Sequence, residues 1–138
     1  MNKTVRTVVL LVVALVLATL ATSCSSASAT QTIELVSPAK AAEVIEDSPE
    51  GLVILDIRTA EEFNQARVSG AIMVDFYAAD FADQLDELDK DVPYVMYCNS
   101  GNRTSEAVKT MKDLGFAEVY EVDGGIQNWY QQGYPIEQ

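Results

Sequence analysis

Beyond residue 30, short apolar runs alternate along the chain with stretches whose apolar residues recur at helical spacing. An apolar run that ends in polar or turn-forming residues is typical of a buried strand. Five such runs predict strands, at residues 32–36, 52–58, 71–76, 93–98 and 118–122. The segments between and after them predict helices, at residues 38–46, 59–63, 80–88, 107–114 and 124–133. This alternation predicts a parallel α/β sheet covered by helices.

Residues that begin helices stand directly after two of the predicted strands. Ser37, followed by proline, is a typical N-cap for the first helix. Thr59 and Glu62 have the spacing of a capping box. The strand before this box therefore ends close to Asp56 and Arg58. Parallel sheets bind ligands beyond the carboxyl ends of their strands, so we expect the functional site there.

The N-terminal segment differs in composition from the rest of the chain. Lys3 and Arg6 precede an apolar run at residues 8–20, and small residues follow it up to Cys24. This order is typical of a secretory signal peptide. The run is shorter than the roughly 20 apolar residues that a membrane-spanning helix needs. We therefore expect residues 1–23 to be a signal peptide and the protein to lie outside the cytoplasm.

Two processing sites compete in this segment. Small residues directly before Cys24 resemble a bacterial lipobox, in which Cys24 becomes the lipid-bearing first residue of the mature protein. Ala27-Ser28-Ala29 would instead suit an ordinary signal peptidase and release a soluble, secreted protein. We favour the lipoprotein, because a cysteine at that point followed by a polar tether is the more specific coincidence. The expected organisation is a signal peptide at 1–23, a lipidated tether at 24–32 that anchors the protein to a membrane, and one domain at 33–138.

Composition and charge narrow the class of the domain. The 138 residues are 49% hydrophobic, which is enough for one packed domain. Removal of residues 1–23 leaves 21 acidic against 7 basic residues, a net charge of −14. So acidic a domain lacks the cationic surface that nucleic-acid binding requires. With no histidine and no clustered cysteines, a zinc or other transition-metal site has no support, and no cofactor is expected.

Cys98 stands in the segment VMYCNSGNRTSEA, where a predicted strand leads into a loop and a helix. If Cys24 is lipidated or removed, Cys98 has no partner for an intramolecular disulfide. An unpaired thiol in an oxidising compartment is more often reactive than structural. A buried, inert Cys98 is the alternative. Because the chain has no histidine, every cysteine nucleophile that uses a histidine as its base is excluded.

The loop after Cys98 has the features of an anion-binding cradle. A row of backbone N–H groups leads into a helix, and these groups belong to Asn99, Ser100, Gly101, Asn102 and Arg103. Gly101 can adopt the backbone angles that a tight loop needs. The helix N-terminus and the Arg103 cation would both stabilise a Cys98 thiolate, and comparable settings lower a cysteine pKa from ~8.5 to roughly 3.5–7.5. In the alternative interpretation, Gly101 is an ordinary turn and Arg103 a solvated residue of the first helical turn.

At these residues the chain resembles a known family. Asp56-Ile57-Arg58, Glu62-Phe63 and Gly70-Ala71-Ile72 are followed by YCNSGNRTSEA and LGFAEVYEVDGGIQNWYQQGYP. In this order the motifs resemble the single-domain rhodaneses, which are sulfurtransferases. The resemblance covers residues 33–138. It implies a five-stranded parallel sheet flanked by helices, with Cys98 as the catalytic residue that carries sulfur as a persulfide.

The resemblance also implies roles for other residues and for partners. The N–H groups from Asn99 to Thr104 would stabilise the persulfide. Asp56 and Arg58 would form an ion-paired wall of the site or, alternatively, a structural pair at a strand end. The implied enzyme is a thiosulfate sulfurtransferase, which moves sulfane sulfur from thiosulfate or a polysulfide to cyanide or a thiol. The alternative is a persulfide carrier or sulfur-binding module with little turnover of its own.

Two features of the loop depart from related proteins. Asn99 stands where many rhodaneses have arginine, so one positive group for an anionic donor is missing. Four residues separate Cys98 from Arg103, whereas related phosphatases have five. The smaller loop suits a sulfur atom better than a phosphoryl group, so we do not expect phosphatase activity.

Overall fold

The computed structural model describes residues 30–138. The predicted signal peptide, the lipidation site at Cys24 and the cleavage site at Ala29 lie outside the described residues. In chain order the elements are β1 (Thr32–Val36), α2 (Pro38–Asp47), β2 (Val53–Asp56), α3 (Ala60–Gln65), β3 (Ile72–Met73), α4 (Phe81–Asp86), β4 (Pro93–Tyr97), α5 (Asn102–Leu114), β5 (Glu118–Val122) and α6 (Gly125–Gln131). No helix among residues 30–138 is long and apolar enough to cross a membrane.

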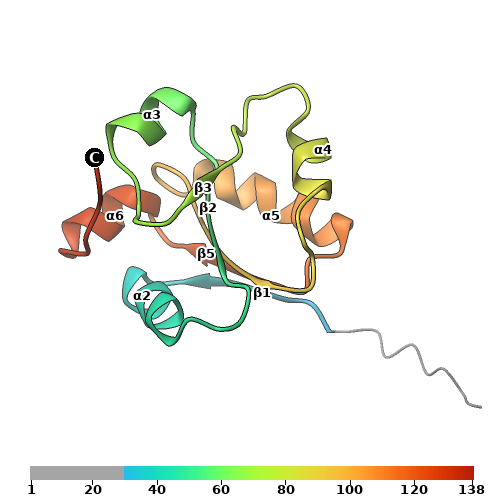
Figure 1. Ribbon diagram of the computed structural model, residues 1–138, viewed down its shortest axis with the longest axis horizontal. Coiled ribbons are helices and arrows are strands. Elements are labelled where there is room, and N and C mark those ends of the chain that lie inside the picture. The colour runs from blue at the N-terminus through green and yellow to red at the C-terminus, as the bar shows by residue number, and fades with distance from the viewer. Residues whose placement is uncertain (1–29) are drawn as a thin grey trace, which may run out of the picture.

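The five strands form one parallel sheet in the order β1-β5-β4-β2-β3. Helix α2 lies on one side of the sheet, and α4 and α5 lie on the other (Figure 1). Side chains of α6 pack in the same apolar cluster as those of α2. The predicted α/β fold, a five-stranded parallel sheet flanked by helices, is confirmed.

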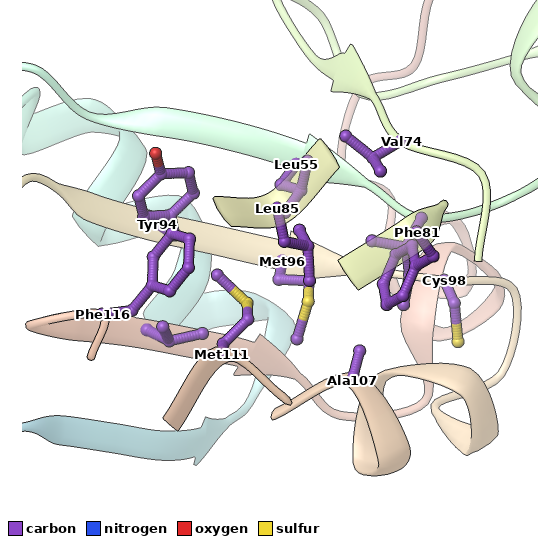
Figure 2. Close-up of a cluster of buried hydrophobic side chains, with 12 residues drawn as sticks. Leu55, Val74, Phe81, Leu85, Tyr94, Met96, Cys98, Ala107, Met111 and Phe116 are labelled. Atoms are coloured by element: carbon purple, nitrogen blue, oxygen red, sulfur yellow. The ribbon is translucent and has the colours of Figure 1, made fainter. Parts of the chain in front are cut away.

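Strand β4 lies at the centre of the sheet, and all five of its residues are buried. Tyr94 and Met96 pack with residues of α4 and α5, while Val95 and Tyr97 pack with residues of α2 and α6. Successive side chains of a strand point to opposite faces, and helices cover both faces here. This explains why the strand reads as an unbroken apolar run. Cys98 follows β4 directly. It belongs to the buried cluster that Tyr94 and Met96 form with α4 and α5, here called the α4/α5 cluster (Figure 2), whose helical members are Phe81, Leu85, Ala107 and Met111.

The predicted helix boundaries rest on capping residues that the structure confirms. The Ser37 side chain accepts a hydrogen bond from the backbone N–H of Lys40 and caps α2. Thr59 and Glu62 form a complete capping box at the start of α3. At the C-terminal end of α5, Gly115 adopts a left-handed conformation and closes the last turn.

Strand β3 and helix α5 differ most from their predicted ranges. Strand β3 has only two residues instead of the six predicted at 71–76. Beyond it the chain still bonds to the end of β2, through Val74 N to Asp56 O and Phe76 N to Ile57 O, but then turns away toward α4. Helix α5 begins at Asn102, after its N-cap Gly101, five residues before the start predicted at residue 107. Strand β1 spans Thr32–Val36 as predicted, and Thr32 N donates to Ala117 O.

Candidate active site

Cys98 occupies the first position after β4, at the carboxyl end of the central strand. Its side chain is buried, with 1% of its surface exposed. Figure 2 shows it at the edge of the α4/α5 cluster, with the sulfur turned away from the other side chains. The end of β2 lies next to this position, since Ile57 N donates to Tyr97 O over 3.1 Å. The structure therefore brings the two predicted strand ends together.

The loop after Cys98 turns its backbone N–H groups toward the sulfur. Gly101 N donates to Cys98 Sγ over 3.1 Å, and Gly101 has a φ of 98°, which favours glycine. Burial raises the pKa of the Cys98 thiol, but hydrogen bonds from the backbone N–H groups of Thr104, Gly101, Ser100 and Arg103 outweigh it, so the pKa lies below that of an ordinary thiol. This backbone arrangement explains how the thiol can be activated without a histidine.

The carbonyl groups of the same loop point the other way and bind the start of α6. Ile126 N donates to Cys98 O over 2.9 Å, and Gln127 N donates to Asn99 O over 3.2 Å. Gly125 allows this contact, because a Cβ there would lie 2.7 Å from the carbonyl carbon of Asn99. Gly125 was not predicted as a site residue, although the Gly-Gly pair after the last strand was a visible signal.

Arg103 is bound to a carboxylate of a different helix. Its two terminal nitrogens donate to the two carboxylate oxygens of Glu62 on α3, over 2.8 and 2.7 Å. Together with the bonds from Thr59, the Arg103 contact lowers the pKa of Glu62 to about 2. The side chain of Arg103 thus joins α3 to α5. Glu62 neutralises much of the Arg103 charge, so this charge stabilises a Cys98 thiolate less than the sequence predicted.

Asp56 and Arg58 form a closed, buried ion pair. Both side chains are almost inaccessible, with 0% and 5% of their surface exposed. Nε and a terminal nitrogen of Arg58 donate to the Asp56 carboxylate over 2.7 to 3.0 Å, and Arg58 also donates to Ala66 O. Burial tends to lower the pKa of Arg58, but the hydrogen bond to Asp56 raises it above its usual range. This geometry favours the structural alternative over contact with a substrate.

The rest of the loop divides into an exposed and a buried part. Ser100 and Asn102 are exposed and Asn99 is half-buried, so this part of the loop faces solvent. Thr104 is fully buried, and its hydroxyl lies 2.7 Å from the carboxylate of Glu121 on β5. Glu121 was not predicted as a site residue. An acidic residue inside the otherwise apolar run EVYEV was the signal that could have revealed it.

The arginine side chains of the described residues are all engaged in ion pairs, between Arg58 and Asp56, Arg67 and Glu137, and Arg103 and Glu62. The loop therefore offers an anion backbone N–H groups rather than a free guanidinium. Within residues 30–138 no three acidic, cysteine or histidine side chains gather as metal ligands would.

The sequence profile of the rhodanese family, described as a rhodanese-like domain, matches residues 37–132. The chain belongs to this family. The matched segment contains the candidate site from Asp56 to Gly125 and every element from α2 to α6. Membership was expected from the order of the motifs and is confirmed.

Several curated relatives of this rhodanese-like protein are named thiosulfate sulfurtransferase GlpE. The protein from Pseudomonas putida is 33% identical over 102 residues, which cover 74% of this chain and 88% of the relative. The protein from Glaesserella parasuis is 30% identical over 107 residues, covering 78% and 95%.

Solved structures agree with the family assignment. A rhodanese-related protein from Thermoplasma volcanium superposes with a TM-score of 0.66 at 27% identity and covers 75% of this chain and 97% of its own. A protein of unknown function from Rhodopseudomonas palustris, described as a possible tyrosine phosphatase, gives a TM-score of 0.66 at 26% identity and covers 76% and 85%.

Proposed function

We propose that this rhodanese-like protein is a sulfurtransferase that carries sulfane sulfur on Cys98 as a persulfide. The observation that supports the proposal best is the Cys98 sulfur facing a ring of backbone N–H groups, in a chain without histidine. Family membership and the relatives named thiosulfate sulfurtransferase support a sulfurtransferase-type function.

In the proposed reaction the Cys98 thiolate attacks the outer sulfur of thiosulfate. The sulfur–sulfur bond of the donor breaks and sulfite leaves with the electron pair, so the enzyme holds Cys98–S–S⁻. A thiophilic acceptor, cyanide or a thiol, then attacks the outer sulfur and regenerates the thiolate. The N–H groups of the loop stabilise the anion of the loaded state, in the manner of an oxyanion hole.

Phosphatase chemistry fits this site less well than sulfur transfer. A phosphoryl dianion is bound best by a bidentate guanidinium. Arg103 already gives both terminal nitrogens to Glu62, and only four residues separate it from Cys98. The exposed part of the loop offers amide and hydroxyl groups of Asn99, Ser100 and Asn102 instead.

A second candidate function is that of a persulfide carrier that loads sulfur but turns over slowly. The pairing of the site's arginines and the absence of a cation at Asn99 favour it, because both weaken the attraction for a small dianion. Steady-state kinetics with thiosulfate and cyanide separate the two functions. Rapid turnover supports the enzyme, while stoichiometric loading with negligible turnover supports the carrier.

The variant Asn99→Arg is expected to improve the use of thiosulfate. An added guanidinium at the exposed part of the loop attracts the dianion, so KM should fall about 3- to 10-fold, and the gain should shrink at high salt. Gln132→Arg, at an exposed position after α6, is the matched control for total charge. An unchanged KM in Asn99→Arg would mean that the donor is bound without help from a charge at this position.

We further propose that Cys24 carries a lipid that holds the protein at a membrane on the extracytoplasmic side. The signal-like residues 1–23 and the small residues before Cys24 support this. A bacterial lipoprotein cysteine carries more than one acyl chain, which stable anchoring requires. We expect Cys24→Ala to lose incorporation of labelled fatty acid and either to stall as a precursor or to be released after Ala29. Soluble wild-type protein that begins at Thr30 would contradict the proposal.

A further inference from the structure

A buried carboxylate lies beneath the Cys98 loop, and the proposed sulfur transfer does not use it. Glu121 is on β5, two residues beyond Val119, so both side chains point to the α5 face of the sheet. Only 7% of its surface is exposed. Its Oε1 lies 2.7 Å from Thr104 Oγ1 and 3.3 Å from Ser105 Oγ, the hydroxyls of two residues in the first turns of α5.

The hydrogen bonds around Gly101 O decide where the Thr104 hydroxyl hydrogen goes. Ser105 Oγ has one hydrogen, and its nearer acceptor is Gly101 O at 2.8 Å rather than Glu121 Oε1 at 3.3 Å. Gly101 O also accepts from Ser105 N over 3.1 Å, so both of its lone pairs are filled. Thr104 has one hydrogen to donate, and it also lies 2.8 Å from Gly101 O. Carboxylates accept more strongly than carbonyls, and Glu121 is the nearer acceptor. The hydrogen of Thr104 therefore points to Glu121.

This orientation determines what Cys98 meets on its buried side. Cys98 Sγ lies 3.9 Å from Thr104 Oγ1. A Thr104 hydroxyl that donates to Glu121 presents lone pairs, not a hydrogen, to the sulfur. It gives no stabilisation to negative charge on Sγ, and the Glu121 carboxylate behind it opposes that charge. In a persulfide the negative charge lies on the outer sulfur, about 2.05 Å from Sγ. We expect this sulfur among the loop N–H groups, which already converge on Sγ, and farther from Glu121.

We propose that Glu121 is a positioning residue that acts through Thr104. By holding the Thr104 hydrogen, it keeps the resting thiolate of Cys98 from being stabilised too strongly and favours the transfer of negative charge to the outer sulfur. The proposal rests on the sulfurtransferase function and concerns its first step. In that step the Cys98 thiolate and thiosulfate become the Cys98 persulfide and sulfite, so sulfur atoms and charge balance.

The other charged groups near the loop are ion-paired or open to solvent. Two ion pairs lie beside the loop. Asp56 at the end of β2 pairs with Arg58, and Glu62 on α3 pairs with Arg103. Glu106 forms an ion pair with Lys109. The side chains of Tyr77 and Asp123 are exposed. Asp75 is half-buried, and its carboxylate accepts a hydrogen bond from Tyr77 N. From α4, the apolar side chain of Phe81 lies in the α4/α5 cluster with Cys98. The first turn of α6 carries no acidic residue.

The test is the rate of Cys98 alkylation by iodoacetamide as a function of pH, in the full chain, with peptide mass spectrometry to separate Cys98 from Cys24. Glu121→Gln keeps the oxygen that accepts from Thr104 but removes the charge. We expect it to lower the midpoint of the profile by about one pH unit. The limiting rate of the less basic thiolate should fall about threefold.

Two further variants complete the test. Thr104→Val removes a hydroxyl whose hydrogen is not on the thiolate, so the midpoint should not rise. Glu118→Gln removes a carboxylate from the same strand, where it binds Tyr120 instead, and should leave the profile unchanged. An unmoved midpoint in Glu121→Gln, or a raised one in Thr104→Val, would overturn the proposal. Alkylation depends on the thiol alone, so its outcome decides the role of Glu121 even if no donor loads Cys98.

Discussion

Replacing Gly125 with alanine is expected to lower the free energy of unfolding by about 3–4 kcal/mol and to disable sulfur loading. Gly125 has a φ of 60°, and an added Cβ would overlap the carbonyl groups of Cys98 and Asn99. Those atoms are backbone and cannot rotate away. The start of α6 would have to move, and the bonds from Ile126 N and Gln127 N that hold the loop would break.

Denaturant unfolding and the alkylation rate of Cys98 check this expectation. Gly133→Ala is the matched control, because Gly133 also has a positive φ, 84°, but an added Cβ there meets nothing within 4 Å. It should cost only the backbone penalty, about 1–2 kcal/mol, and leave Cys98 unaffected. Equal losses in the two variants would show that close packing of α6 against the loop is not what Gly125 provides.

Replacing Arg103 with alanine is expected to lower the free energy of unfolding by about 2 kcal/mol at pH 6. The variant removes both bonds between α5 and Glu62, whose side chain is partly exposed, so the effect is smaller than for a fully buried pair. The effect on the Cys98 thiol should be a small rise in pKa. Backbone N–H groups remain in place, and Glu62 already neutralises much of the guanidinium charge.

The pH dependence of the free energy of unfolding tests whether the ion pair between Glu62 and Arg103 stabilises the fold. The pKa of Glu62 is about 2 in the folded protein and roughly 4.3 in an unfolded chain. A lowered pKa contributes stability that is present above the unfolded value and is lost as the pH falls through the folded value. The difference between wild type and Arg103→Ala should therefore shrink between pH 5 and pH 2, to below about 1 kcal/mol. A difference that is constant over this range would contradict the assignment.

The location of the site could be predicted because it depends on local patterns. The apolar run PYVMY reads as a strand buried on both faces, and Cys98 follows it directly. Gly101 marks a tight loop, and the helical spacing that follows marks α5. In a parallel sheet these features alone place the sulfur at the carboxyl edge, under the first N–H groups of a helix.

The contacts that tune the site could not be predicted, because they join segments far apart in the sequence. Glu62 was recognised as a capping residue, yet its carboxylate also binds Arg103, 41 positions later. Glu121 reaches Thr104 only because β5 lies beside β4 in the sheet. The shortness of β3 likewise depends on the turn that carries the chain toward α4. Spacing within a segment carries no information about such pairings.

The most direct test of the central claim is whether Cys98 itself carries the transferred sulfur. The purified protein is incubated with thiosulfate or a polysulfide, and intact-mass and peptide mass spectrometry then locate any adduct. We expect one added sulfur of about 32 Da on the Cys98 peptide, its release as thiocyanate by cyanide, and neither in Cys98→Ser. The absence of an adduct on Cys98 with every donor, or thiocyanate formation that persists in Cys98→Ser, would contradict the account.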